Sequence, residues 1–95
     1  MPWQKRYINK RELNPAYNIF RSAVRKRDKN RCQFPGCKKA GREVHHIIKY
    51  ADSNYLKHEV DNGILLCKDH HEDVKGKEGH YVKTFSDIVL RKKQK

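Results

Sequence analysis

Seven of the nine cysteine and histidine residues of this 95-residue chain lie in three short clusters. In chain order, the clusters are Cys32 with Cys37, His45 with His46, and Cys67 with His70 and His71. Side chains this close in sequence can reach one metal ion together, so the clusters favour metal sites. Three cysteines cannot all pair in disulfides, which favours thiolate ligands in a reducing compartment over a secreted disulfide scaffold.

The spacing of two clusters predicts a structural zinc site. Four residues separate Cys32 from Cys37, and two separate Cys67 from His70. Four ligands of this type favour tetrahedral zinc with no position open to a substrate. Cys67 and His71 are also a workable chelate, so the spacing alone leaves open which histidine binds zinc. The alternative is that the cysteines are small buried hydrophobic residues, but that role needs no chelating spacing.

The small size of the chain makes a metal important for its stability. Only 36% of the residues are hydrophobic, so one domain with a thin core is expected. Structural zinc contributes ~10–16 kcal/mol to the folding of zinc-finger peptides, which is comparable to the whole stability of a domain. We therefore expect zinc to decide whether the chain folds.

Positive charge is concentrated at the two ends of the chain. The net charge of +12 divides into +8 for residues 1–31, zero for residues 32–79 and +4 for residues 80–95. We expect a single domain over residues 1–95, with a neutral core between a basic N-terminal flank and a basic C-terminal helix and tail. One-sign flanks attract a polyanion, most plausibly nucleic acid. For the last five residues, a solubility tail is an equal alternative.

The first predicted element is a helix that begins at Pro15, with Asn14 as its N-cap, and ends between residues 28 and 30. Apolar residues at helical spacing predict its buried stripe, which is Ala16, Ile19, Phe20, Ala23 and Val24. Basic residues off this stripe should face solvent or a partner; they are Arg21, Arg25 and Lys26.

The rest of the chain predicts a small mixed structure. Strands are expected over residues 42–50 and 64–67, the second entered through a turn at Asn62 and Gly63, with a polar loop over residues 51–61. Helices are expected over residues 68–75 and 79–91. The last helix should bury one face, formed by Tyr81, Phe85, Ile88 and Val89.

The paired histidines should have different roles. Neighbouring residues on a strand point to opposite faces, so His45 and His46 cannot both bind one ion from a regular strand. Neighbouring residues on a helix lie about 100° apart, so of His70 and His71 one can face zinc while the other faces elsewhere. His58 and His80 are interpreted as surface histidines.

Three segments together resemble the HNH endonucleases. They are EVHHI at residues 43–47, NGILLC at residues 62–67, and the pair His70-His71. The resemblance covers residues 32–75 and implies an α+β fold, a small zinc-stabilised ββα-metal core with flanking N- and C-terminal helices. Zinc-containing members usually have Cys-x2-Cys followed at once by the final His, whereas here His70 stands in place of the last cysteine. The first pair has four intervening residues instead of the usual two.

The resemblance also implies catalytic roles. His46 would be the general base, His45 and His71 would bind a catalytic divalent ion (Mg²⁺, Mn²⁺, Ni²⁺ or Zn²⁺), and Asn62 would orient His46. Histidine suits the role of base because its unperturbed pKa lies near neutrality. Lys75, one helical turn after His71, is expected to contact a phosphate.

The implied substrate is DNA, held through its phosphate backbone and either nicked or cut in both strands. Besides Lys75, the residues expected at phosphates are Arg21, Arg25, Lys26, Arg91, Lys92 and Lys93. Family context suggests a homing or phage packaging-associated enzyme in the cytoplasm of a bacterium or a phage-infected cell. No apolar run reaches the ~18 residues of a membrane helix, and residues 1–10 lack the apolar region of a secretory signal. The oligomeric state is left open.

Two alternatives need no catalysis. A non-catalytic zinc module that binds nucleic acid through its basic ends requires the zinc ligands alone. A zinc-stapled protein-interaction domain requires still less, because its charge would be incidental. Both leave His45, His46, His71 and Asn62 without a role, and the motif therefore favours the nuclease.

Overall fold

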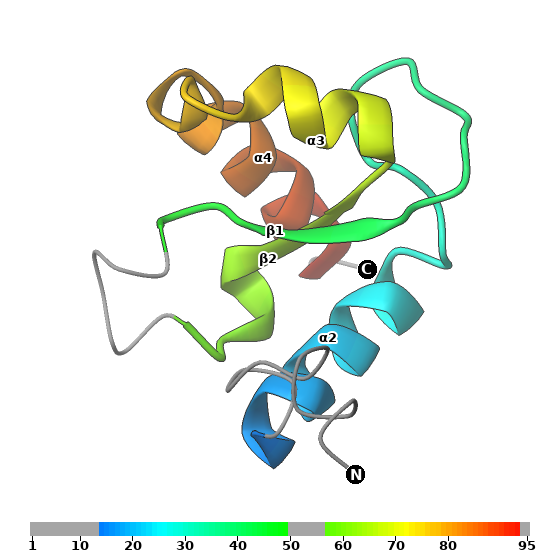
Figure 1. The fold of residues 1–95 in the computed structure, drawn as a ribbon, viewed down its shortest axis with the longest axis vertical. Helices are drawn as coiled ribbons and strands as arrows, with labels where there is room; N and C mark the ends of the chain where they lie inside the picture. Colours follow the sequence, from blue (N-terminus) through cyan, green and yellow to red (C-terminus); the bar gives the residue numbers. More distant parts are fainter. Residues whose placement is uncertain (1–13, 50–56, 94–95) are drawn as a thin grey trace, which may run out of the picture.

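A computed structural model describes residues 14–49 and 57–93 of the chain (Figure 1). The elements are, in chain order, α2 (Pro15–Arg27), β1 (Glu43–His46), the short 3-10 helix η2 (Val60–Asn62), β2 (Gly63–Leu66), α3 (Lys68–Val74) and α4 (Glu78–Lys93). The predicted α+β fold is thus confirmed, and the consecutive β1, β2 and α3 form a ββα unit. Parts of four predicted segments lie outside the described residues: 1–13 of the basic N-terminal flank, 50 of the strand, 51–56 of the loop, and 94–95 of the tail.

β1 and β2 pair antiparallel, with His45 opposite Ile64 and His46 opposite Gly63. The predicted strand over residues 42–50 is too long, because regular pairing ends at His46. The side chain of Asn62 takes over at this point, since its Oδ1 accepts the N–H of Ile48 (2.8 Å) and its Nδ2 donates to the Ile48 carbonyl (3.1 Å). At the other end of the hairpin, Cys67 directly follows β2 and is the N-cap of α3.

Helices cover both faces of the hairpin. α2 lies on one side, and α3 and α4 lie on the other (Figure 1). Side chains alternate along β2 accordingly: Leu65 packs with the buried residues of α2, whereas Ile64 and Leu66 pack with Phe85 and Val89 of α4. The four residues of β2 are all buried, so this strand is the centre of the core.

The start of α2 is as predicted, but the prediction of its buried face is partly wrong. The Asn14 side chain accepts the Ala16 N–H (2.9 Å), and Pro15 opens the helix. The buried residues are Tyr17, Phe20 and Val24. Ile19 is 70% exposed. The predicted and observed buried faces share Phe20 and Val24. Tertiary contacts decide which other residues of α2 face the core, and the Tyr17 ring contacts the rings of His46 and His58.

Close approach of α2 to the hairpin requires a glycine in β2. A Cβ atom at Gly63 would stand 2.7 Å from Phe20 Cζ and 2.7 Å from Val24 Cγ2. Real Cβ atoms do not come that close to another heavy atom, so the bare backbone of Gly63 makes room for the helix.

The C-terminal helix follows its predicted face. Phe85 and Val89 are buried, and Tyr81 and Ile88 are half-buried against the same cluster. α4 extends further than predicted, to Lys93. Within the described ranges, none of the helices has the length and apolar character needed to cross a lipid bilayer.

Candidate functional site

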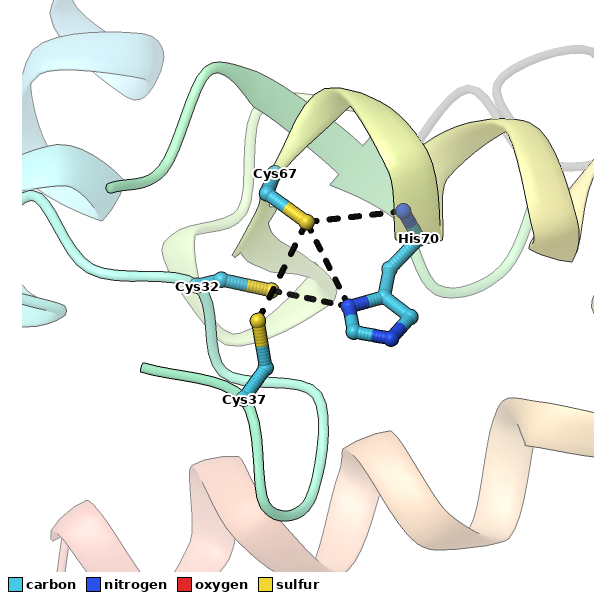
Figure 2. A group of neighbouring side chains, drawn as sticks. All are labelled: Cys32, Cys37, Cys67 and His70. Carbon is cyan, nitrogen blue, oxygen red and sulfur yellow. Dashed lines mark hydrogen bonds between the residues drawn. The ribbon is translucent and has the colours of Figure 1, made fainter. Parts of the chain in front are cut away.

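Four side chains converge at the junction of the Cys32–Cys37 turn with α3 (Figure 2). The ligand atoms of Cys32, Cys37, Cys67 and His70 all lie within 4.8 Å of one another. Cys37 Sγ lies 3.9 Å from Cys67 Sγ, and His70 Nδ1 lies 3.6 Å from Cys32 Sγ and 3.3 Å from Cys67 Sγ. Sulfurs bound ~2.3 Å from one tetrahedral zinc would be ~3.8 Å apart. The cluster could therefore hold a structural zinc.

Local structure explains why these four atoms meet. The turn between Cys32 and Cys37 is closed by a bond from the Cys37 N–H to the Phe34 carbonyl (2.9 Å), and Gly36 supplies the positive φ of +83°. Cys67 caps α3, so its sulfur faces the first turn of that helix, which carries His70. The Phe34 ring stacks on the His70 ring with centroids 4.1 Å apart, which holds the imidazole toward the sulfurs.

Burial alone makes this cluster unfavourable for negative charge. It raises the pKa of the Cys32 thiol to about 11. Burial also acts to raise the pKa of Cys67, but the backbone N–H of His70 and the neighbouring thiols outweigh it, and the net shift is downward. Cys67 thus ionises more readily than Cys32, which needs a bound cation to do so.

His45 and His71 meet at a separate place, on the α3 and α4 side of the hairpin. Their ring centroids are 6.1 Å apart, and the His45 ring is also edge-on to Phe85 (5.6 Å). His45 Nε2 is buried and has no hydrogen-bond partner among the described residues. Burial, and then the charge of His71, lower the pKa of His45 to about 4. A neutral imidazole with an unpartnered nitrogen is the form that binds a metal ion, so His45 fits a ligand role.

Glu78, which no sequence pattern identified, acts electrostatically on His45. Its carboxylate favours a positive charge on His45, and Glu78 Oε1 lies 3.9 Å from the Nζ of Lys49. Its own backbone N–H and that of Gly76 lower the pKa of Glu78, so this carboxylate is ionised. Glu78 opens α4 after the α3–α4 turn, and nothing in the local sequence distinguishes it from other acidic residues at helix starts.

His46 lies on the opposite face of the hairpin from His45, as strand alternation predicted. Its ring stacks on Phe20 (5.0 Å) and lies 6.4 Å from the Tyr17 ring. Its Nε2 is 2.9 Å from the Lys57 carbonyl. Because a carbonyl only accepts, this contact places the proton of the neutral ring on Nε2 and leaves Nδ1 as the basic nitrogen.

Asn62 acts on the backbone that follows His46. Besides its two side-chain bonds to Ile48, its carbonyl accepts the Ile47 N–H (2.8 Å). The predicted role of Asn62, to orient His46, stays a prediction.

The basic residues expected at phosphates on α2 are in different environments. Lys26 is exposed, whereas Arg21 and Arg25 are half-buried. The Arg21 guanidinium lies 5.8 Å from the Tyr17 ring centroid, and Arg25 donates to the Arg42 carbonyl (2.8 Å).

On α3 and α4, several of these basic residues lie beside carboxylates of the chain itself. Lys75 follows α3 and pairs with Glu72 (2.8 Å). Lys92 Nζ lies 3.9 Å from Asp28 Oδ1, and Lys93 pairs with Asp61 (2.8 Å). Arg91 is exposed. Exposed ion pairs contribute little to stability, so Lys75 and Lys93 can exchange their carboxylates for phosphates at small cost.

Comparison with known proteins agrees with this geometry. Residues 32–73 match the family model described as HNH endonuclease. Comparisons with curated proteins and with solved structures found no match. The matched segment contains the Cys3His cluster, both strands of the hairpin and both members of the His45–His71 pair. The match over residues 32–73 therefore supports the resemblance to the HNH endonuclease family.

Proposed function

We propose that this protein is a metal-dependent endonuclease that hydrolyses phosphodiester bonds in DNA. The observation that carries the proposal is the pairing of His45 with His71 at a place separate from the Cys3His cluster. The buried Nε2 of His45 has no hydrogen-bond partner among the residues that the structure describes. A zinc-binding module needs only the cluster. A second histidine pair within an HNH family segment supports a second, catalytic ion.

The proposed chemistry combines this pair with His46, the residue that follows His45 in the chain. A divalent ion held by His45 and His71 would stabilise the charge that develops on the scissile phosphate and on the leaving 3′ oxygen. His46 would take the proton of the attacking water at Nδ1 as the water oxygen bonds to phosphorus and the bond to the 3′ oxygen breaks. The Nε2–H of His46, directed at the Lys57 carbonyl, would stabilise the imidazolium that forms.

The proposal extends to the setting of the reaction. DNA would be held through its phosphates by the excess of basic residues, since the chain carries a net charge of +12. We propose a bacterial or phage enzyme that works in the cytoplasm, in homing or in packaging of phage DNA. Free thiols at a zinc site suit that reducing compartment.

The discriminating experiment is a time course on supercoiled plasmid with zinc-loaded protein. Cleavage should require added Mg²⁺, Mn²⁺, Ni²⁺ or Zn²⁺, and the ratio of nicked to linear product tells whether one strand or both are cut. His71→Ala should remove cleavage, whereas the control His80→Ala, at an exposed position of α4, should retain it. Plasmid binding without cleavage under every metal would contradict the nuclease and favour the non-catalytic zinc module.

A further inference from the structure

We propose that Arg27 and Asp28, at the end of α2, are positioning residues of the active site. They lie outside the matched segment 32–73, and they hold the turn that carries Asn62. Through Asn62 they fix the backbone that follows His46. This inference rests on the proposed nuclease function for its catalytic consequence, whereas its structural part can be tested without cleavage.

The Arg27 side chain spans the turn on both sides of Asn62. Its Nη1 donates to the Val60 carbonyl (2.8 Å), and its Nη2 donates to the Gly63 carbonyl (2.6 Å). These two carbonyls bracket Asn62, which is 5% exposed. The planar fork of a guanidinium can hold two carbonyls at a fixed separation, which the single ammonium of a lysine cannot do.

Asp28 fixes the guanidinium from the other side. Its Oδ1 accepts from Arg27 Nε (2.8 Å) and its Oδ2 from Arg27 Nη2 (2.9 Å), a two-pronged contact. The same Oδ2 accepts the Leu65 N–H in β2 (3.0 Å). The Asp28 side chain is fully buried, and a buried carboxylate persists only when it is paired and hydrogen-bonded. The pair is thereby tied to both η2 and β2.

The hydrogen bonds of Arg27 distinguish it from its basic neighbours on α2. Its bonds to Asp28, Val60 and Gly63 use four of the five N–H groups of a guanidinium. Its side chain is 17% exposed. Arg27 is therefore committed to the protein interior, although its sequence position, within the basic flank, would assign it to DNA.

Hydrogen bonds on both sides of the turn, joined by its backbone, connect this pair to the residues that follow the catalytic histidines. Arg27 holds the carbonyls on either side of Asn62, and Asn62 holds both backbone groups of Ile48 and the N–H of Ile47. Ile47 directly follows His46. A shift of the turn would therefore move His46, and displacement of a catalytic group by ~1 Å can cost ~10²-fold in rate.

The test compares Arg27→Lys with Arg31→Lys. Both substitutions keep the charge, but Arg31 is exposed and makes one long contact, 3.5 Å to the Lys38 carbonyl. In Arg27→Lys we expect single-turnover cleavage at saturating DNA to fall ~10-fold or more, with zinc content unchanged and Kd for DNA within ~2-fold. Arg31→Lys should match the wild type in all three. Wild-type cleavage by Arg27→Lys would overturn the proposal.

A second measurement, amide hydrogen exchange, separates positioning from general stability and needs no cleavage. In Arg27→Lys, exchange at Ile47 and Ile48 should accelerate more than at Leu66, whose position in β2 reports the core. Equal acceleration at all three amides would show a purely structural role and overturn the proposal. If the wild type cleaves no DNA, the nuclease proposal fails, and this measurement still decides whether Arg27 holds the turn.

If Arg27→Lys does not fold, the proposal can still be tested. Asp28→Asn would then replace it, because the amide oxygen keeps an acceptor for the Leu65 N–H. If that variant also fails to fold, exchange in the wild type decides. The Ile48 amide should be protected as strongly as the Leu65 amide, since one hydrogen-bonded unit holds both. Much faster exchange at Ile48 in the folded wild type would overturn the proposal.

Discussion

Two adjacent histidines on α3 contribute to separate sites. His70 joins the three cysteines, whereas His71 lies beside His45. A helix turns about 100° per residue, so one residue pair can contribute to two sites from a single turn. The spacing of Cys67 with either histidine left both assignments open, and in the structure the ring nitrogen of His70 lies with the three sulfurs.

Substitutions at the two histidines should separate stability from catalysis. His70→Ala removes one of four prospective zinc ligands, so zinc content and the melting temperature should fall sharply, since zinc binding is coupled to folding. His71→Ala should keep zinc and the wild-type melting temperature but lose plasmid cleavage. Metal analysis, thermal unfolding and a cleavage assay on both variants check this. The opposite pattern would reverse the two assignments.

His46 should be needed for the chemical step alone. We expect His46→Gln, which keeps most of the side-chain volume beside Phe20, to bind DNA and zinc normally while single-turnover cleavage falls by ~10² or more. Rates measured at saturating DNA separate this loss from weaker binding. Near-wild-type cleavage would contradict the role of His46 as base and point to another group as the base.

At the scale of helices and strands, the sequence predicted correctly those features that depend on neighbouring residues. The Asn14-Pro15 cap, the apolar face of α4 and the Asn62-Gly63 turn into β2 were readable because each depends on neighbouring residues. β1 was predicted too long because its end is set by Asn62, 14 residues from Ile48 in the chain. No periodic pattern of residues in the sequence indicates this long-range contact.

The residues of the candidate site also divide into those that the sequence predicted and those that it did not. Chelate spacing and the HNH resemblance identified the residues of the Cys3His cluster and the His45–His71 pair. The sequence did not identify Glu78 or the pair Arg27 and Asp28, because their roles arise from long-range contacts. The inward turn of Tyr17 was missed for the same reason, since its ring contacts lie across the fold with His46 and His58.

The contact between α2 and the hairpin should be sensitive to one methyl group. Gly63→Ala would place a Cβ 2.7 Å from Phe20 Cζ, and overpacking of this kind costs ~1–3 kcal/mol. Gly79→Ala is the matched control, because its Cβ would meet nothing within 4 Å and alanine favours a helix by ~1 kcal/mol over glycine. Urea unfolding should show the first variant destabilised and the second not. Equal stability of Gly63→Ala and wild type would mean that α2 sits further from β2.

At the scale of the molecule, the Cys3His cluster and the hydrophobic core are one unit. Cys32 and Cys67 belong to the same buried cluster as Phe85 and Val89 of α4. We expect about one tightly held zinc per chain, and a strong chelator should unfold the whole ββα unit. Metal analysis and circular dichroism check this, with Cys37→Ser and Cys67→Ser as variants. Wild-type melting in both variants would show that zinc does not hold the fold.

The basic C-terminal end of α4 should serve both binding and the active site. Each phosphate neutralised by Lys or Arg gives a log–log salt slope of roughly −0.9 on duplex DNA, so deletion of residues 91–95 should make the slope shallower. Lys92 and Lys93 also lie beside Asp28 and Asp61. The deletion therefore removes positive charge next to the buried carboxylate that fixes Arg27.

We thus expect the deletion to lower the single-turnover rate at saturating DNA as well as the affinity, whereas a simple phosphate-binding tail would change affinity alone. Lys83→Gln is the control for loss of positive charge, because Lys83 is exposed and pairs only within α4, with Asp87 among the described contacts. Binding at several salt concentrations and single-turnover cleavage measure both effects. An unchanged slope would show that the tail serves solubility, and an unchanged saturated rate would show that the end of α4 does not support the Asn62 turn.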